Sequence, residues 1–464
     1  MPHTEPFAAL RYSLDHIADL SDVVAPPYDV IDPELQDSLY KRHPANVVRV
    51  ILNRDEPGDG DQDRYRRAAG FVNDWIRQGV LRRDDQPAYY VYHQIFDVDG
   101  HSHTRRGFMA RIRIEPFGSG NVYPHEETHP KAKVDRLKLT TATRQNNSQI
   151  FGLYPDTENE IIQSLDAAAA AVTPVVATDH LGVVHKLWAV TDSEVIAEVS
   201  GLMADKPMFV ADGHHRYETA SNYRDQIAAQ LGAQQHAGQQ DGILPAETQQ
   251  NATLPADHPA NFVMTMLVGM SDPGMLVLPT HRLLRQTPAF SAADLIAKLS
   301  DCFECQTLDG GIDAAAAAWS QMESTDRQDQ LALYAAGDPC WVMARAKPAA
   351  AQRMAVIAAG NSDDWRQLGV SLLHRLVIDD LLGCAGHPKP TYVHEIDEVI
   401  AGLKGQGTAA ESEGDSDYTL AALVMPAKLS HVEAISLHKE RMPAKSTYFY
   451  PKLLSGLCFN PLED

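Results

Sequence analysis

Hydrophobic positions near the middle of the chain change from strand-like to helix-like spacing within a few residues. Residues 208–211 form a short apolar run of the length of a buried strand, and Asp212-Gly213 ends it. From His214 onward, apolar residues between 217 and 223 recur at three- and four-residue spacing, which is typical of a helix. The pattern therefore predicts a strand, a tight glycine turn and a helix that begins at His214.

The same patterns predict strands and helices along the rest of the chain. The expected strands cover residues 23–31, 43–50 after a turn, 88–96, 104–114, 185–190, 262–270, 276–283, 391–393 and 418–425. The expected helices cover residues 64–79, 163–171, 192–202 and 370–382. Residues 97–100 join two strands as a hairpin. Strands mixed with helices in this way predict an α+β (mixed α/β) fold.

The composition and the hydrophobic pattern of the sequence change at about residue 288, where expected alanine-rich helices and short strands begin. We therefore expect an N-terminal α/β domain over residues 1–287 and a C-terminal α/β module over residues 288–464. Within the first domain, residues 230–259 are rich in Gln, Ala, Gly and Pro and lack periodicity. This composition predicts a flexible insert.

Composition narrows the class of partner. The chain has 464 residues, with 40 basic and 62 acidic side chains and a formal net charge of -22, which argues against a nucleic-acid partner. No apolar run of membrane-spanning length and no signal pattern is present, so we expect a cytoplasmic protein without a membrane partner. Five scattered cysteines do not predict a disulfide framework. Composition leaves a homo-oligomer open.

The strand–turn–helix at residues 208–223 is dense in side chains that suit phosphate chemistry. A helix N-terminus favours an anion, and Gly213 would let a phosphate approach the backbone. Arg216 could bind phosphate oxygens through its guanidinium, and His215 could join it. Asp212 could hold a metal or take a proton, and His214 is a further candidate catalytic residue. The alternative is an ordinary turn with a capping aspartate.

A second polar block follows residue 122. It includes His125, Glu126, Lys133 and Arg136, which together could provide cations for phosphate oxygens and a carboxylate for magnesium. The alternative is a solvated helix with charge pairs four residues apart.

Three further candidates lie near the ends of expected strands. Asp29 follows a double proline that would hold it rigidly, and the alternative is a rigid strand exit. His281 and Arg282 end an expected strand, a usual place for ligand contacts. Residues 445–447, Lys-Ser-Thr, form a compact cationic and hydroxyl cluster suited to a carboxylate or phosphate. The alternative for this cluster is a strand docked on the core.

These blocks resemble known families. Residues 213–216, Gly-His-His-Arg, are similar to the Gly-x-x-Arg phosphate-binding motif of the ParB/sulfiredoxin superfamily, which includes ParB-type nucleotide-binding proteins, sulfiredoxin and kinases of free serine. From residue 23 to the C-terminus the chain resembles the family catalogued as domain of unknown function 1015. The matching blocks include residues 25–30, the His-Glu-x-Thr of residues 125–128 and the Asn-Asn-Ser of residues 146–148. The resemblance implies a ParB/sulfiredoxin-like core with an additional C-terminal module.

The simplest account is that the dense blocks converge on one pocket. Neither a P-loop nor a protein-kinase signature set is present. A kinase here would therefore be of another kind. Because the residue types of these blocks suit phosphate chemistry, we predict a small-molecule kinase that moves phosphate from ATP or a similar donor to a hydroxyl acceptor. The resemblance implies free serine as the acceptor and Asp29 as the catalytic base.

The predicted roles follow from these chemistries. The predicted catalytic residues are Asp29, Asp212 and His214. The predicted nucleotide-binding residues are Gly213, His215, Arg216, His125, Glu126, Lys133, Arg136, His281 and Arg282. Lys445, Ser446 and Thr447 would bind the acceptor, and Asp212 and Glu126 would bind Mg²⁺. The alternatives are a non-catalytic nucleotide-binding regulatory protein and a phosphohydrolase.

Overall fold

The computed structural model of the chain describes residues 3–118, 120–126, 130–237, 253–338, 340–406 and 418–463. The chain folds into two compact units. Unit 1 comprises Met1–Pro124, Thr128–Met275 and Pro451–Asp464, and unit 2 comprises His125–Glu127 and Leu276–Tyr450. Residues 276–287, which were expected in the N-terminal domain, thus belong to unit 2. The last segment of the chain returns to unit 1.

Unit 1 is built on one large sheet. Its strands are β1 (Thr4–Glu5), β4 (Tyr89–Val98), β5 (His101–Arg113), β6 (Val122–Pro124), β8 (Ile150–Tyr154), β9 (Val175–Thr178), β10 (Val184–Val190), β11 (Met208–Asp212) and β12 (Phe262–Gly269). In the described residues these nine strands run in the order β6-β11-β8-β12-β5-β4-β10-β9, with β1 added beside β5. The pairs β6–β11 and β8–β12 are parallel, and the other pairs are antiparallel. The α+β class predicted from the sequence is confirmed.

The β4–β5 hairpin forms as its sequence predicts. Val98 pairs with His101 across the turn, and Asp99 and Gly100 adopt left-handed φ angles of 51° and 76°. A two-residue hairpin turn with positive φ at both positions matches the twist of the strands, and Asp-Gly adopts it readily.

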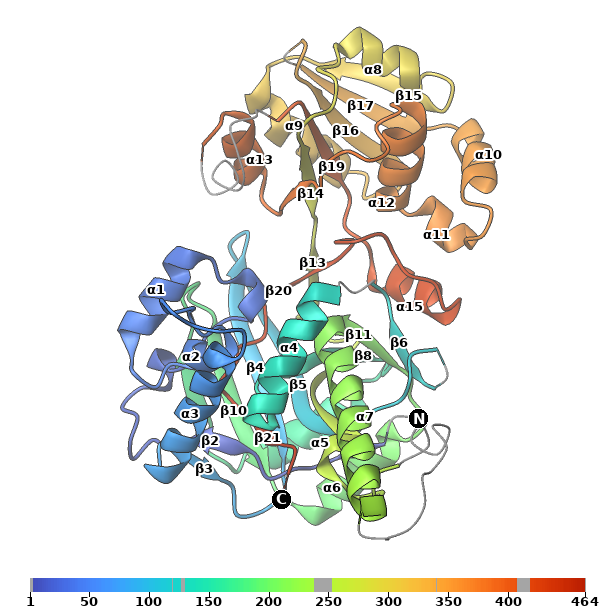
Figure 1. Cartoon of the computed structure of the whole chain (residues 1–464). Coiled ribbons are helices and arrows are strands. Elements are labelled where there is room, and N and C mark those ends of the chain that lie inside the picture. Colours follow the sequence, from blue (N-terminus) through green and yellow to red (C-terminus); the bar gives the residue numbers. More distant parts are fainter. Residues whose placement is uncertain are drawn as a thin grey trace. The chain divides into compact units, whose positions relative to one another are not determined.

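Helices cover both faces of the unit 1 sheet. The helices are η1 (Leu20–Asp22), η2 (Tyr28–Val30), α1 (Pro33–Arg42), α2 (Val48–Ile51), α3 (Asp63–Arg77), α4 (Pro130–Thr143), α5 (Glu160–Ala169), α6 (Ser193–Met203), α7 (His214–Ala237) and η4 (Pro259–Asn261). Figure 1 shows α3, α4 and α7 side by side, and contacts between neighbouring helices join them. Helices α5 and α6 pack on the sheet through a buried apolar core. Two short ladders, β2 (Leu10–Tyr12) with β3 (Leu81–Arg83) and β7 (Gln145–Asn146) with β21 (Asn460–Pro461), complete the unit.

Unit 2 is built on an antiparallel sheet. Its strands are β14 (His281–Leu284), β15 (Phe303–Leu308), β16 (Gln330–Ala335), β17 (Cys340–Ala346), β18 (Thr391–Val393) and β19 (Leu420–Val424). They run in the order β15-β17-β16-β19-β14-β18. A separate ladder joins β13 (Leu276–Leu278) to β20 (Tyr448–Tyr450).

Helices also flank the unit 2 sheet. They are α8 (Ala292–Leu299), η5 (Ile312–Ala314), α9 (Ala315–Glu323), α10 (Pro348–Ile357), α11 (Asp363–Gln367), α12 (Gly369–Ser371), η6 (Leu372–Leu381), α13 (Ile396–Leu403) and α15 (Leu429–Leu437). Apolar residues of α9 and α13 pack against the sheet in one buried cluster.

Two expected strands are replaced by helical turns. Residues 23–31 make a single bridge, from Ala25 to Ser455, and then the short helix η2, because the double proline cannot donate to a ladder. Residues 48–51 form α2, where the Asn46 side chain accepts from the Val48 amide at 2.9 Å. A short buried apolar run does not by itself distinguish strand from helix.

Three other predicted elements differ in detail. The expected strand over residues 276–283 is interrupted at residues 279–280, so β13 and β14 join different sheets. The expected helix over residues 370–382 forms, but residues 372–381 are wound as a π-helix. Within the expected insert, α7 runs to residue 237, and residues 238–252 lie outside the described part of the chain.

Among the helices that the structure describes, none combines the length and the apolar character needed to cross a membrane.

Candidate functional site

The strand–turn–helix at the start of α7 forms as the sequence predicts. Strand β11 ends at Asp212, Gly213 has a φ of +91°, and the Tyr217 amide donates to the Gly213 carbonyl at 2.9 Å. A Cβ atom on Gly213 would lie 3.0 Å from the Arg216 guanidinium. The glycine is therefore required both by its backbone conformation and by the close approach of Arg216.

Two cations approach Asp212 in unit 1. The Arg216 guanidinium lies 3.5 Å from one Asp212 oxygen and also donates to the Gln149 carbonyl. The Lys452 ammonium lies 3.0 Å from the other Asp212 oxygen. One carboxylate between two cations leaves positive charge in excess, beside a helix N-terminus that also favours anions.

Arg105 is a buried cation that the sequence reading missed. Arginine side chains usually lie at the surface, but Arg105 is 0% exposed. It donates to Gln94 and to the Pro451 carbonyl, and it lies over the Phe151 ring at 4.8 Å. Burial lowers the pKa of Arg105 to about 10, while the charge of Asp212 acts in the opposite direction. Strand alternation, which places Arg105 on the same buried face as Gly107, was the available signal.

A cavity of about 40 Å³ adjoins the start of α7. Tyr28, Arg136 and Arg216 line it, together with Asn147 and Thr219. The Thr219 side-chain oxygen and the Asn147 side-chain carbonyl oxygen are buried, and neither has a hydrogen-bond partner among the residues that the structure describes. Buried polar atoms are nearly always hydrogen-bonded in native proteins. These two atoms therefore indicate a cavity that receives a polar ligand or ordered water.

The Arg136 and Tyr28 side chains form a wall of this cavity. The Arg136 guanidinium stacks 3.9 Å from the Tyr28 ring centre. It also donates to Asp135 at 2.8 Å and to the Ile51 carbonyl at 2.7 Å. A second cavity of about 80 Å³ shares the Tyr28 and Arg136 wall and also contains Arg64. Burial raises the pKa of Tyr28, and charges on Arg136, Asp29, Arg216 and Asp212 all act on its hydroxyl.

Asp29 lies next to this wall, on η2. Its side chain is exposed, and within the described part of the chain the carboxylate forms no hydrogen bond or ion pair. An unengaged carboxylate can accept a proton from an incoming hydroxyl.

The remaining predicted residues of unit 1 lie on α4 and at the start of α7 but are not among the residues that line the cavity. His214 is buried and His215 is half-buried in the first turn of α7. The Lys133 ammonium pairs with Glu218 at 2.8 Å, so it ties α4 to α7. Thr128, which the resemblance included, lies outside the described residues.

The other predicted site residues belong to unit 2. They are His125, Glu126, His281, Arg282, Lys445, Ser446 and Thr447. The hydroxyls of the last two are already used: Ser446 donates to the Pro443 carbonyl at 2.5 Å, and Thr447 bonds the His125 ring at 2.9 Å.

His281 is fully buried in unit 2. Its ring packs on Trp319 at 4.8 Å, and within the described part of the chain neither ring nitrogen has a hydrogen-bond partner. Burial lowers the pKa of His281 to about 3, assisted by the charges of Arg282 and His394.

A magnesium ion does not fit the residues that the structure describes. Within them, no group of three or more His, Cys, Asp or Glu side chains is placed to hold a metal. Asp212, one of the two predicted ligands, already has a cation at each oxygen. Glu126, the other, belongs to unit 2.

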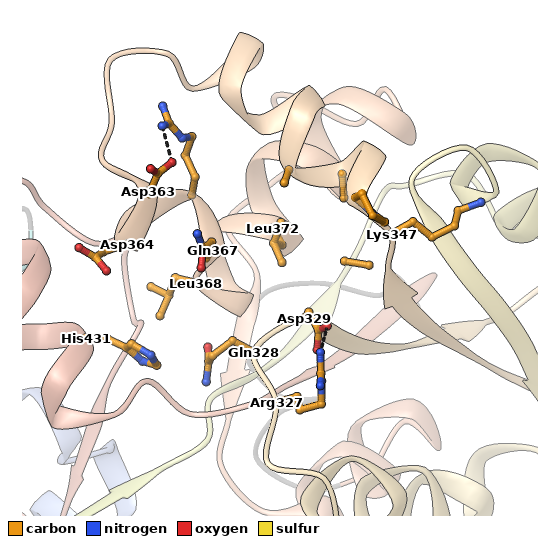
Figure 2. Close-up of a pocket in the computed structure, with 15 residues that line it drawn as sticks. Arg327, Gln328, Asp329, Lys347, Asp363, Asp364, Gln367, Leu368, Leu372 and His431 are labelled. Atoms are coloured by element: carbon orange, nitrogen blue, oxygen red, sulfur yellow. Dashed lines mark hydrogen bonds and ion pairs between the residues drawn. The ribbon is translucent and has the colours of Figure 1, made fainter.

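A larger cavity of about 540 Å³ lies in unit 2, away from the predicted residues. Figure 2 shows Arg327 beside Asp329 on its lining. A second lining pair joins Arg366 to Asp363 at 2.6 Å, and Lys347 and Asp364 add one charge of each sign. The charges of these pairs cancel, so volume alone does not make this cavity a phosphate site. The surplus cation and the unpaired polar atoms distinguish the smaller cavity of unit 1.

The fold and the site together define an α+β protein with a cationic pocket at a helix start. A family model described as "Protein of unknown function (DUF1015)" matches residues 4–371. The chain belongs to this family, which confirms the resemblance found in its sequence. No curated protein matches the chain.

Several solved structures resemble the chain distantly. A mutant of free serine kinase in complex with AMP is 9% identical, with a TM-score of 0.30, over 71% of this chain and 84% of that one. Another mutant of free serine kinase, in complex with ADP, is 8% identical with a TM-score of 0.31 over the same shares. A conserved hypothetical protein from Pyrococcus furiosus is 10% identical with a TM-score of 0.30, over 72% and 89%. Likeness at this level assigns no activity.

Proposed function

We propose that unit 1 binds the phosphate groups of a nucleotide at the start of α7. The observation that carries this proposal is the cavity lined by Arg136 and Arg216, where the Asn147 and Thr219 side-chain oxygens have no hydrogen-bond partner among the described residues. A phosphate offers oxygens to the guanidinium groups and to the first amides of α7. A phosphate hydroxyl, a ribose hydroxyl or a bound water can donate to the Asn147 oxygen.

We further propose that the protein is a phosphotransferase that uses ATP or a similar donor. The phosphoryl group would move from the donor to the oxygen of a hydroxyl acceptor, and the donor would leave as its diphosphate. The acceptor proton would pass to Asp29, whose carboxylate is exposed and unengaged within the described residues. Arg216 and the helix start would hold the phosphate in line, because this chemistry depends mainly on positioning and charge stabilisation. Free serine is the acceptor that the sequence resemblance implies.

A second candidate function is nucleotide binding without catalysis, as in a regulatory protein. The ion pairs of Asp212 favour this function, because Arg216 and Lys452 each hold one of its carboxylate oxygens. A carboxylate held in this way is poorly placed to act as a base or a metal ligand.

The decisive experiment is calorimetric titration of ATP, ADP, CTP and pyrophosphate into the full chain and its Arg216→Ala variant. We expect the variant to bind at least about tenfold more weakly, because one charge-assisted hydrogen bond contributes roughly 1.5–3 kcal/mol. Arg224→Ala is the matched control, since Arg224 lies on the same helix and bonds Asp225 and the Ile114 carbonyl instead. A folded Arg216→Ala chain with unchanged affinity would contradict the phosphate site.

Asp29→Asn separates the two candidate functions. A phosphotransferase should lose turnover of a hydroxyl acceptor and keep its nucleotide affinity, because the amide cannot accept the proton. A binding protein should show no phosphoryl transfer in either form.

A further inference from the structure

We propose that unit 2 contains its own binding site for a small oxyanion, a carboxylate or a phosphate, centred on Arg282. This inference concerns unit 2 by itself and does not depend on the nucleotide site of unit 1.

Arg282 is a buried cation without a carboxylate partner. It lies on β14, between β18 and β19, and is 1% exposed. Its terminal nitrogens donate to the carbonyls of Thr280 and, at 2.8 Å, Lys445. Its Nε has no hydrogen-bond partner, and among the described residues no carboxylate lies within 4 Å of the guanidinium. A buried charge is costly unless it is paired, so an unpaired guanidinium indicates that an anion is missing.

Other cations gather at the same place on the sheet. Tyr392 lies on β18, directly opposite Arg282 on β14. Its ring centre lies 5.7 Å from the Arg282 guanidinium. The Lys389 ammonium lies 5.9 Å from the same ring, and the charge of Lys445 also acts on Tyr392. Glu126 is the carboxylate whose charge acts on both Arg282 and Tyr392. Three cations and one carboxylate leave a net positive cluster.

Neighbouring groups do not neutralise this cluster. His374, on the π-helix η6, senses the charge of Arg282, and burial lowers the pKa of His374 to about 3. It is therefore a neutral neighbour, and its Nε2 has no hydrogen-bond partner in the described segments. π-Helical segments occur frequently at functional sites.

Lys445 connects the buried cation to the surface. Its carbonyl accepts from Arg282, its backbone has a left-handed φ of 57°, and its side chain is exposed. Non-glycine residues rarely adopt this conformation. The exposed Lys389 and Lys445 have no ion-pair partner in the part of the chain that is described, so both are available to an incoming anion.

The charges define the class of ligand. A metal ion would be repelled by three cations. A long nucleic acid would need a basic surface, whereas the whole chain carries a net charge of -22. A carboxylate or phosphate group matches a guanidinium whose neighbour Tyr392 also lies near the Lys389 ammonium and senses the charge of Lys445.

Equilibrium dialysis with radiolabelled inorganic phosphate tests the site. The protein is the full chain carrying Arg216→Ala, so that the unit 1 cavity does not contribute to binding. We expect saturable binding that Lys445→Gln weakens about tenfold, as loss of one charge-assisted contact would, and that Lys389→Gln also weakens. Lys298→Gln is the matched control, because Lys298 is exposed in unit 2 and lies 5.9 Å from the Phe290 ring. Both test lysines are exposed, so their replacement should not disturb folding.

Competition identifies the ligand class. Displacement of the label by acetate would assign the site to carboxylates, and displacement by unlabelled phosphate alone would assign it to phosphates. The proposal is overturned if the Arg216→Ala chain binds no phosphate, or if Lys445→Gln and Lys389→Gln bind as tightly as Lys298→Gln. In the wild-type chain, two classes of phosphate site would support both proposals. One class that depends on Lys445 but not on Arg216 would support only the unit 2 site.

Discussion

Thr219 is the residue on which the role of the unit 1 cavity can be tested most directly. It is 2% exposed, and its hydroxyl has no hydrogen-bond partner in the described residues. A hydroxyl buried without a partner destabilises a protein, and replacing it with a methyl group of similar shape removes that cost. A ligand that bonds the hydroxyl would reverse this balance.

We therefore expect Thr219→Val to change stability and binding in opposite directions. The free energy of unfolding without ligand should stay constant or rise by about 1 kcal/mol, whereas nucleotide affinity should fall. Denaturant titration and calorimetry measure the two effects. Thr265→Val is the control, because the Thr265 hydroxyl donates to the Val263 carbonyl at 3.4 Å, and it should leave affinity unchanged. Equal affinity in Thr219→Val and wild type would leave the Thr219 hydroxyl without a role in binding.

His281 predicts a pH dependence of stability at the same scale. Burial lowers the pKa of His281 from its ordinary value of 6.5 to about 3. Between these values the unfolded chain binds a proton that the folded chain does not, so the free energy of unfolding falls as the pH falls below 6.5. At pH 5 the loss from this one residue is about 2 kcal/mol.

The test is to compare His281→Phe with the wild type by denaturant unfolding at pH 7 and pH 5. The phenylalanine ring can keep the packing on Trp319 but cannot titrate. The variant should lose about 2 kcal/mol less than the wild type between the two pH values. An identical loss in both proteins would show that His281 can be protonated within the fold.

At the scale of the element, the start of α7 depends on Gly213. A side chain there must adopt a φ of +91° and must also displace the Arg216 guanidinium. We expect Gly213→Ala to lower the free energy of unfolding by about 1–2 kcal/mol and to weaken phosphate binding.

Gly100→Ala separates these two effects. Gly100 has a φ of +76°, but no atom lies within 4 Å of the position its Cβ would take. The Gly100→Ala variant should therefore have a lower free energy of unfolding, because of backbone strain, and an unchanged affinity for phosphate. If Gly213→Ala binds phosphate as the Gly100→Ala variant does, the contact between Gly213 and Arg216 is irrelevant to the site.

Elements with strong periodicity were predicted well, and short apolar ones were not. The β4–β5 hairpin, α3 and the β11–α7 turn form where the sequence placed them. Residues 48–51 form α2, and the Asn46 side chain just before it accepts from the Val48 amide. That contact is local, but a four-residue segment with three apolar residues does not by itself distinguish a helix from a strand.

At the scale of the whole molecule, the last segment of the chain completes unit 1. The Lys452 carbonyl accepts from Gln94, the Leu454 carbonyl accepts from Gln149, and Asn460 pairs with Asn146 in the β7–β21 ladder. This segment also brings the Lys452 ammonium to Asp212.

A chain that ends at Tyr450 should therefore lose the phosphate site of unit 1 and become sensitive to proteolysis there. Without the segment, the Arg105 guanidinium loses the Pro451 carbonyl and remains buried with fewer partners, which is destabilising. Limited proteolysis and phosphate titration measure both effects, and a synthetic peptide of residues 451–464 added in excess should restore binding. Lys452→Gln is the milder companion, expected to weaken binding without exposing unit 1 to proteases. A truncated chain that binds phosphate normally would contradict this role.

Local sequence was enough to predict the geometry at the start of α7: a strand, a glycine turn and a helix with Arg216 in its first turn. It also determined the family, because ordered blocks of residues identify a family without any knowledge of their contacts. Only the tertiary structure decided which charges meet. Arg105 and Lys452 reach the neighbourhood of Asp212 from 107 and 240 residues away in the sequence. Local periodicity determines which face of an element is buried, whereas pairing between distant strands and segments determines what that face meets, and such pairing leaves no signal within a short window of sequence.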